Sequence, residues 1–328
     1  MLLAGDIGGT KTLLGLFSPA DRRPALLSTA VFATAEHDSL VRMVGRFLDG
    51  HDRPAIEAAC FGVAGPVHEQ RATLTNVPWT VAAADIAATF SIRTVSLLND
   101  LQAMAYGVPI LERAELDTLQ EGVPVSGGNA ALIAAGTGLG EAFLHFVDGR
   151  FVPAASEGGH ADYSPRTPAE VGLMQALTAR YGRAEWEHVL SGPGLVNVHH
   201  YLHARGCPVC DPSVDPALAP AIIATAALER RCPQCVASLE MFVAAYGAEA
   251  GNLALRCLST AGLYVGGGIA PKILPALRTP LFCDAFRSKP PMTALLETIP
   301  VRVILNEQTA LLGAAVVANE HRRRTTGR

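Results

Sequence analysis

The sequence predicts a duplicated α/β fold whose two halves share a cleft. Two glycine-rich turns, at residues 5–11 and 136–140, each join two short apolar runs, a pattern typical of a β-hairpin. Each turn opens a strand-rich segment that leads into helices. The repeat lies in the order of the elements and not in a sequence period. We expect hinge motion of one half against the other.

The first half continues with further elements of both kinds. We expect a third strand at residues 25–33, a helix at 39–48, buried strands at 55–63 and 94–98, and a short helix at 101–106. For the second half we expect strands at 130–135, 141–147 and 150–154, helices at about 168–181, 193–203, 215–229 and 236–258, a strand at 262–265, and a last strand at 301–305 before a helix at about 308–318. The prolines of residues 208–220 indicate a loop or an insertion.

The composition is that of a soluble chain with a large core. Hydrophobic residues make up 49% of the 328, charged residues 17%, and the net charge is −4. Without a basic stripe, nucleic acid is not expected as a partner. No apolar stretch approaches the ~18 to 20 residues of a membrane helix, and the N-terminus lacks the basic region of a secretory signal. With an odd count of seven cysteines as well, we expect a cytoplasmic protein.

The first glycine turn reads Gly-Asp-Ile-Gly-Gly-Thr-Lys. Glycines let the backbone approach a ligand, and their N–H groups can form a nest for phosphate oxygens. Asp6, at the strand end, is a candidate ligand for Mg²⁺ through water. A plain hairpin turn without a ligand is the alternative. A P-loop is excluded, because the glycines here do not have the G-x-x-x-x-G-K-[ST] spacing and a strand follows the turn where a P-loop has a helix. The turn at 136–140 also precedes a strand, so two phosphate-type turns favour a nucleotide over a dinucleotide.

Other polar residues fall at points where strands and loops end. Asp100 stands where a buried strand meets a helix, and taken alone it is most simply a helix N-cap. In residues 156–162, Glu157 and His160 surround two glycines and can hydrogen-bond the vicinal hydroxyls of a sugar. One histidine and one short carboxylate are too few ligands for zinc there. Glu187 by itself has the ordinary interpretation of a surface glutamate.

Four cysteines form two C-x₂-C pairs, Cys207 with Cys210 and Cys232 with Cys235. Their spacing is close to that of a four-thiolate zinc site, and the prolines tighten both turns as zinc knuckles require. Such a zinc would be structural, because four thiolates leave no open coordination position. Four buried thiols without metal are the alternative.

Together these segments resemble the bacterial glucokinase family of the actin-like ATPase superfamily. The resemblance runs in family order over nearly the whole chain, and it rests on LAGDIGGTKTLLGLF, LLNDLQAMAYG, AAGTGLGEAFL, SEGGHADYSP, HVLSGPGLVN, ERRCPQC and YVGGGIAPKI. It implies an ATP-dependent kinase that phosphorylates D-glucose at O6 by in-line transfer, with Asp100 as the general base and Mg²⁺ as cofactor.

The resemblance also implies which residues bind the two substrates. ATP phosphates would be bound by Gly5, Asp6, Ile7, Gly8, Gly9 and Thr10, and by Gly136, Thr137 and Gly138. Residues 266–268 match a nucleotide-binding region. Glucose would be bound by Asn99, Asp100, Glu157, His160 and Glu187.

The fold that the resemblance implies is a duplicated actin-like ATPase (ribonuclease H-like) fold. Its small α/β domain would comprise residues 1–108 plus about 301–320. A larger α+β domain would comprise 109–300, with an insertion at about 204–235 that carries both cysteine pairs. The cleft would lie between the two domains. The family usually forms homodimers.

The chain departs from the commoner family pattern in two places. Lys11 stands where many relatives carry Asn, and the first cysteine pair looks like an addition. The second pair has a counterpart in relatives not known as metalloproteins, which counts against zinc. ROK-type hexose and N-acetylhexosamine kinases, and non-catalytic sugar-sensing regulators, are the alternative. ROK proteins carry a cysteine-rich zinc motif beside an ExGH loop. This chain has the loop, as EGGH, without that cysteine motif, so we place the ROK group second.

Overall fold

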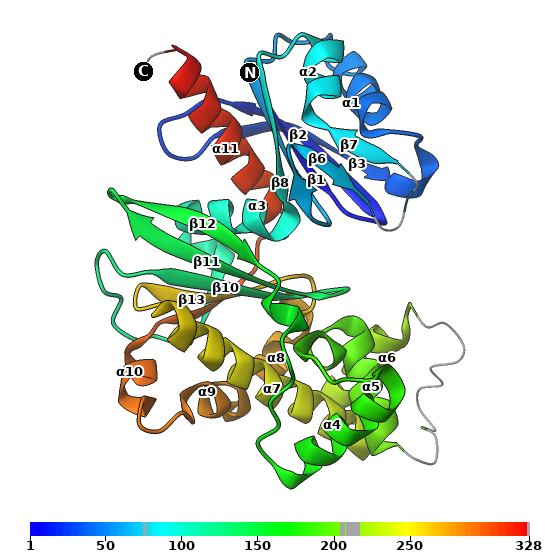
Figure 1. The fold of residues 1–328 in the computed structure, drawn as a ribbon, viewed down its shortest axis with the longest axis vertical. Coiled ribbons are helices and arrows are strands. Elements are labelled where there is room, and N and C mark those ends of the chain that lie inside the picture. Colours follow the sequence, from blue (N-terminus) through cyan, green and yellow to red (C-terminus); the bar gives the residue numbers. More distant parts are fainter. Residues whose placement is uncertain (75–76, 78, 204–206, 208–216, 327–328) are drawn as a thin grey trace. The chain divides into compact units, whose positions relative to one another are not determined.

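The structure is a computed structural model that describes residues 1–328 except 75–76, 78, 204–206, 208–216 and 327–328 (Figure 1). The chain forms two compact units. The first comprises Met1–Glu112, Phe151–Ala155 and Asn306–Arg328, and the second Arg113–Arg150 and Ser156–Leu305. None of the described helices combines the length and apolar composition that crossing a bilayer requires.

The first unit contains a five-stranded sheet of order β3-β2-β1-β4-β8 and a small sheet of order β5-β6-β7. Its strands are β1 (Leu2–Ile7), β2 (Lys11–Ser18), β3 (Ala25–Ala33), β4 (Ala58–Val63), β5 (Val67–His68), β6 (Arg71–Thr73), β7 (Thr80–Ala82) and β8 (Thr94–Asn99). Its helices are α1 (Leu40–Asp49), α2 (Ala83–Phe90), α3 (Asp100–Gly107) and α11 (Thr309–Thr326), with 3₁₀ turns at Thr34–Glu36 and Val108–Ile110.

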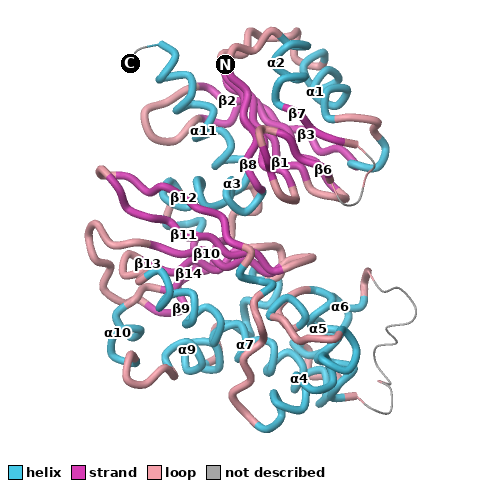
Figure 2. The backbone as a smooth tube through the Cα atoms, in the orientation of Figure 1, coloured by secondary structure: helices cyan, strands magenta, loops and turns pink. Residues whose placement is uncertain are grey.

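Helices cover both faces of the five-stranded sheet (Figure 2). Because side chains alternate along a strand, Leu3 of β1 points into the core with α1 and α2, whereas Leu2 points into a second core with α11. Both leucines are fully buried. The near-continuous apolar strands of this sheet are therefore those of a sheet buried on both sides.

The other large sheet has six strands in the order β12-β11-β10-β13-β14-β9, and it lies in the second unit except for Phe151–Ala155 of β12, which group with the first unit. Its strands are β9 (Leu116–Gln120), β10 (Ala130–Ala135), β11 (Leu139–Val147), β12 (Arg150–Ser156), β13 (Gly262–Gly266) and β14 (Val301–Ile304). The helices of the second unit are α4 (Pro168–Tyr181), α5 (Gly192–Leu202), α6 (Ala219–Leu228), α7 (Pro233–Cys257), α8 (Leu274–Leu277), α9 (Pro280–Arg287) and α10 (Thr293–Thr298), with 3₁₀ turns at Arg113–Glu115, Gly158–His160, Trp186–His188 and Ala270–Ile273.

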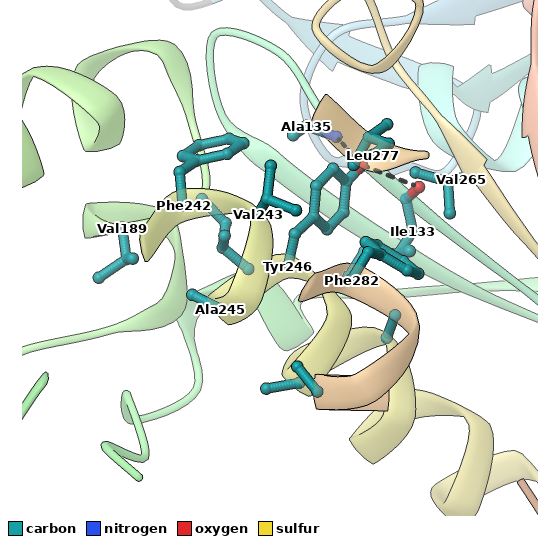
Figure 3. Packing of buried hydrophobic residues seen from close by; sticks show 14 of the residues in the cluster. Ile133, Ala135, Val189, Phe242, Val243, Ala245, Tyr246, Val265, Leu277 and Phe282 are labelled. Carbon is teal, nitrogen blue, oxygen red and sulfur yellow. Dashed lines mark hydrogen bonds between the residues drawn. The ribbon is translucent and has the colours of Figure 1, made fainter. Parts of the chain in front are cut away.

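The core of the second unit is built around α7. Tyr246 of this helix is fully buried, and its ring packs edge-on against Phe282 of α9 at a centroid distance of 5.8 Å (Figure 3). The Tyr246 hydroxyl accepts a hydrogen bond from the Ala135 N–H at 3.0 Å and lies 3.3 Å from the Gly266 carbonyl oxygen. One phenol therefore joins the ends of β10 and β13.

Most predicted elements are confirmed, and two domain assignments are corrected. Phe151–Ala155 group with the first unit, although the resemblance places them in the large domain. The resemblance also places the strand predicted at 301–305 in the small domain with the last helix. In the structure β14 lies in the second unit, because Leu263 and Val265 of β13 pair in parallel with Val301 and Val303. Of the last strand and the last helix, only the helix, α11, belongs to the first unit. The small sheet, α2, β9 and the helices α8 to α10 were not predicted.

Glu141 of β11 is a fully buried carboxyl in this core. The Arg256 guanidinium lies 2.6 Å from the neighbouring Glu249 carboxylate and 3.7 Å from Glu141. Burial, followed by the charge of Glu249, raises the pKa of Glu141 from 4.5 to about 8. The single positive charge of Arg256 thus faces the carboxyl groups of Glu141 and Glu249. If Glu141 keeps its proton, the remaining negative charge of Glu249 is matched by the positive charge of Arg256.

This arrangement predicts a pH-dependent stability. Between pH 4.5 and about 8 the folded chain holds a proton that the unfolded chain has lost, so the free energy of unfolding falls as pH rises. The slope from one such group is at most about 1.4 kcal/mol per pH unit. Glu141→Gln should flatten this dependence in urea unfolding at a series of pH values. The exposed α7 variant Glu240→Gln serves as control, and a Glu141→Gln curve parallel to the wild-type curve would contradict the assignment.

Candidate active site

The first glycine turn joins β1 to β2 as predicted. The two strands pair antiparallel from Leu2↔Phe17 to Ile7↔Thr12, and the Gly8 N–H donates to the Lys11 carbonyl at 3.0 Å. Thr34, which follows β3, stabilises the turn, since its hydroxyl donates to the Gly8 carbonyl at 2.9 Å. Residues 8–11 are partly or fully exposed, so the turn presents backbone to a ligand.

The neighbouring strand ends bring Asp6, Asn99 and Asp100 to one edge of the first sheet. Strands β1, β4 and β8 are parallel, so their carboxyl ends meet at that edge, where ligands of open α/β sheets bind. The Asn99 side-chain amide donates to the Gly65 carbonyl at 3.2 Å. A Cβ at Gly62 would lie 2.8 Å from the Ala103 side chain, so this glycine lets α3 approach the sheet.

The helix cap at this edge is Asn99 and not Asp100. The Asn99 side-chain oxygen accepts from the N–H groups of Leu101 at 3.0 Å and Gln102 at 3.3 Å. Asp100 is the first residue of α3, and one of its carboxylate oxygens accepts from the Leu101 N–H at 2.8 Å. The interpretation of Asp100 as an N-cap is therefore wrong by one residue, and Asn99 performs the capping that Asp100 would otherwise supply.

Asp6 and Asp100 interact through their charges. Burial, followed by the negative charge of Asp100, raises the pKa of Asp6 to about 6, although the Lys11 ammonium acts in the opposite direction. A divalent cation would relieve this repulsion, and carboxylate oxygens are the donors that Mg²⁺ prefers. The donor set at this edge therefore fits the predicted magnesium.

The second glycine turn joins β10 to β11 and is bound by Glu187. The Glu187 carboxylate accepts from the Leu139 N–H at 2.8 Å, and a Cβ at Gly138 would lie 2.4 Å from the same oxygen. The Gly192 N–H, at the start of α5, donates to the Gly136 carbonyl at 2.8 Å. The sequence suggested no link of Glu187 to this turn, because the two are far apart in the chain.

Residues 266–268 lie beside this turn at the carboxyl edge of the second sheet. Gly267 has a φ of +83°, and a Cβ there would lie 2.3 Å from the Ala135 carbonyl oxygen. The Tyr246 hydroxyl holds both strand ends, as described above. Tyr246 therefore positions two glycine segments at once, and no sequence motif marks it.

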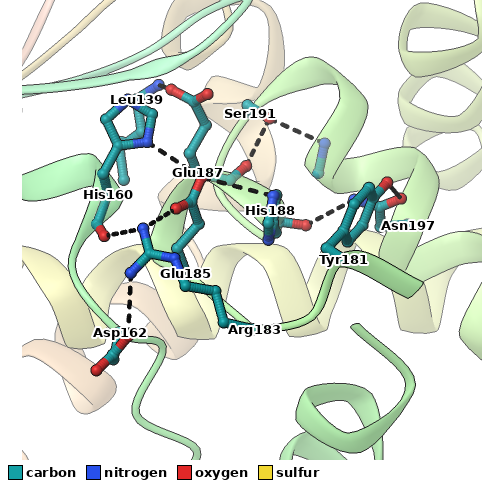
Figure 4. A network of polar contacts seen from close by, with 11 residues as sticks. Leu139, His160, Asp162, Tyr181, Arg183, Glu185, Glu187, His188, Ser191 and Asn197 are labelled. Carbon is teal, nitrogen blue, oxygen red and sulfur yellow. Dashed lines mark hydrogen bonds and ion pairs between the residues drawn. The ribbon is translucent and has the colours of Figure 1, made fainter. Parts of the chain in front are cut away.

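The loop at 156–162 is fastened to the segment at 183–188 by backbone hydrogen bonds. The Trp186 N–H donates to the Ala161 carbonyl, and the Tyr163 N–H to the Ala184 carbonyl, both at 3.0 Å. His160 thereby meets Glu185, with its Nδ1 3.1 Å from the carboxylate (Figure 4). Glu157 is exposed and precedes the 3₁₀ turn Gly158–His160.

Glu185 and Arg183 orient His160 and were missed as functional residues. The Arg183 guanidinium donates to the His160 carbonyl at 2.8 Å and to the Glu185 carboxylate. The hydrogen bond to Glu185, with the charges of Glu187, Glu185 and Glu157, raises the pKa of His160 against the effect of burial. Burial acts to raise the pKa of Glu185. The hydrogen bond from His160 and the charges of His188, His160 and Arg183 outweigh this effect, so the pKa of Glu185 is lowered.

His160, Glu185 and Glu187 form a compact polar cluster. Each offers one atom within 4.8 Å of the others, which is a spacing suited to a metal ion or to adjacent hydroxyls of one ligand. Because Arg183 already pairs with Glu185, the cluster is better suited to neutral hydroxyl groups than to a cation. The resemblance assigned His160 and Glu187 of this cluster to glucose, and the structure adds Glu185.

The predicted cysteine cluster is assembled in part. Cys207 lies 3.7 Å from the sulfur atoms of both Cys232 and Cys235. Cys210 lies outside the described residues. His199 and His203 each offer a ring nitrogen within 4.8 Å of the sulfur atoms of Cys207 and Cys235, and neither was predicted there.

Solved structures place this fold among the sugar kinases. A glucokinase from an Antarctic psychrotroph superposes with a TM-score of 0.87 at 27% identity, covering 97% of this chain and 98% of the other. A ROK family glucokinase from Streptomyces griseus shares the fold, with a TM-score of 0.65 at 23% identity over 97% of this chain and 99% of the other.

The sequence identifies the family. The glucokinase family model matches residues 3–321. A glucokinase of Nostoc punctiforme is 40% identical over 97% of this chain and 98% of its own length. The chain belongs to the glucokinase family, and the ROK alternative remains second.

Proposed function

We propose that this chain is an ATP-dependent glucokinase that transfers the γ-phosphoryl group of ATP to O6 of D-glucose, giving glucose 6-phosphate. The observation that carries the proposal is the family match over residues 3–321, together with curated glucokinases at 33–40% identity. The duplicated actin-like fold is part of the proposal. One large sheet begins with β3-β2-β1 and the other with β12-β11-β10, and a glycine turn joins β1 to β2 and β10 to β11.

Asp100 is the proposed general base. It accepts the O6 proton as the new O–P bond forms, and the helix N-terminus on which it stands favours its ionised form. Asn99 is proposed to hydrogen-bond the sugar while it caps the same helix. Phosphoryl transfer needs little covalent help, so the first task of these groups is to position the alcohol for in-line attack.

The glycine turns are proposed to hold the phosphates. Residues Gly5 to Thr10 supply N–H groups in the first unit, and Gly136, Thr137 and Gly138 supply them in the second. Asp6 would hold Mg²⁺ through water. When bound, the cation neutralises charge on the phosphate oxygens of ATP.

The remaining sugar contacts are proposed to come from Glu157, His160 and Glu187. The structure supports a polar, pre-oriented cluster, because Glu185 and Arg183 hold His160 in place. Glu187 has a second task, since it already accepts from the Leu139 N–H of a phosphate turn. We propose that it couples sugar binding to the position of that turn.

Two further proposals rest on the resemblance and the composition. The chain is proposed to form a homodimer, which sedimentation equilibrium would measure, and to act in the cytoplasm.

The sugar site can be tested with a coupled assay and a hexose panel. Wild-type protein should show its highest kcat/KM for glucose when glucose, mannose, fructose and glucosamine are compared with ATP as donor. Glu157→Gln should raise the glucose KM by roughly tenfold, the effect of weakening one charged hydrogen bond, with a smaller change in kcat.

Glu297→Gln, an exposed glutamate of α10, is the matched control and should leave KM unchanged. An unchanged KM in Glu157→Gln would show that another group dominates sugar binding. A higher kcat/KM for another hexose would overturn the assignment of glucose as the substrate.

A further inference from the structure

A cluster of sulfur and imidazole groups lies where two helices of the second unit meet, apart from the residues assigned to catalysis. His203 is the C-cap residue of α5, and Cys207 follows it. Cys232 is the N-cap residue of α7, and Cys235 lies in its first turn. The proposed phosphoryl transfer uses none of these residues.

Three separations within the cluster are those of metal ligands. Cys207 Sγ lies 3.7 Å from Cys232 Sγ and 3.7 Å from Cys235 Sγ, and His203 Nε2 lies 3.4 Å from Cys232 Sγ. Four ligands around tetrahedral zinc, with Zn–S near ~2.3 Å and Zn–N near ~2.0 Å, stand about 3.5 to 3.8 Å apart. A disulfide would bring two sulfur atoms to about 2.05 Å. The observed spacing therefore matches coordination and not a disulfide.

The surroundings favour thiolates. Cys232 and Cys235 stand at the N-terminus of a 25-residue helix, whose dipole stabilises the negative charge of a metal-bound thiolate. Thiolate and imidazole together select zinc over the hard cations that carboxylates prefer.

His199 stands one helical turn before His203 and could compete for the metal. The Ser238 hydroxyl donates to the Gln234 carbonyl at 2.7 Å, so it accepts from His199 Nδ1 at 3.3 Å and leaves Nε2 of that ring as the acceptor. The two imidazole rings lie 4.3 Å apart. His203 has the direct contact with Cys232, and we assign the fourth position to it.

We propose that Cys207, Cys232, Cys235 and His203 bind one structural zinc ion. Four protein ligands leave no open position for chemistry. The ion would tie the end of α5 to the start of α7. Ser191, the N-cap residue of α5, donates its hydroxyl to the Glu187 carbonyl at 2.7 Å, so the start of this helix is tied to the active-site segment. The ion would anchor the far end of the same helix.

Metal analysis tests the proposal independently of catalysis. The full chain, expressed with zinc in the medium and purified without chelator, should contain about one zinc per chain by mass spectrometric element analysis. Cys235→Ser should lose this zinc. Cys283→Ser, which removes a buried thiol of α9 in the same unit, should keep it. Wild-type protein without zinc, with its cysteines as free thiols or disulfides, would overturn the proposal, as would full zinc in Cys235→Ser.

Cobalt and the histidine variants test the ligand set without depending on the fold of a serine variant. Wild-type protein stripped of zinc and loaded with Co²⁺ should show the intense visible bands and the sulfur-to-metal charge transfer of tetrahedral thiolate coordination. His203→Cys should keep one metal and shift these bands toward those of four-sulfur coordination. His199→Gln should keep the wild-type spectrum. Loss of metal in His199→Gln but not in His203→Gln would overturn the assigned set.

Discussion

Replacing Asp100 with asparagine should abolish turnover and leave glucose binding within a modest factor of wild type. Asparagine has the same shape but cannot accept the O6 proton, and loss of a general base costs ~10² to 10⁴-fold or more in rate. Asn99 still caps α3 in this variant, so the helix should persist. The measurements are kcat in the coupled assay and glucose affinity by calorimetry.

The control for Asp100→Asn is Asp85→Asn. Asp85 also lies in the first turn of a helix in the first unit, but it is exposed on α2. Each variant loses a favourable charge at a helix N-terminus, worth roughly 0.3 to 1 kcal/mol. Asp100→Asn also relieves the repulsion of Asp6, so its loss of stability in thermal unfolding should be the smaller one. Retention of most of kcat in Asp100→Asn would refute its role as general base.

Replacing Asp6 with asparagine should stabilise the ligand-free protein and at the same time remove most of its activity. Asp6 has a pKa of about 6 in the folded chain against an ordinary 3.8, so the folded state resists its ionisation. Removing this penalty should add up to about 3 kcal/mol to the free energy of unfolding at pH 8. The rate should fall ~10²-fold or more, because the variant lacks the carboxylate that we propose holds Mg²⁺ through water.

The sign of the pH effect is fixed by the direction of the shift. Between pH 3.8 and about 6 the folded chain binds more protons at Asp6 than the unfolded chain does, so wild-type stability falls as pH rises through this window. The gain from Asp6→Asn should therefore be near zero at pH 4 and complete above about pH 7. Urea unfolding across this range measures it. A variant that is active, or less stable than wild type at pH 8, would be inconsistent with the assignment.

Much of the candidate site could be predicted, because its signals are local. The hairpin at residues 5–11 follows from glycines between apolar runs, and the helix after Asp100 follows from the end of a buried strand. Prediction failed by one residue at the cap of α3. An Asn and an Asp in succession can each cap a helix, and the choice depends on which side chain reaches the N–H groups of Leu101 and Gln102.

Contacts across long stretches of chain were the ones that prediction missed. Glu187 binds the N–H of Leu139, 48 residues away, and Glu185 binds His160, 25 residues away. β14 joins the second sheet because its partners are β13 and β9, which its own apolar sequence cannot reveal. Neither set of contacts leaves a periodic pattern in the sequence.

The sequence by itself determined the strands, the glycine turns and the family motifs, because backbone propensity and short-range spacing act within a few residues. Only the tertiary structure decided what these motifs face. It brought Asp6 close enough to Asp100 for their charges to interact, and it placed Glu187 on the second glycine turn. It also brought His203 to the thiol of Cys232, 29 residues further along the chain. Packing of α5 against α7, together with the pairing of the strands, produces these encounters, and no local rule encodes them.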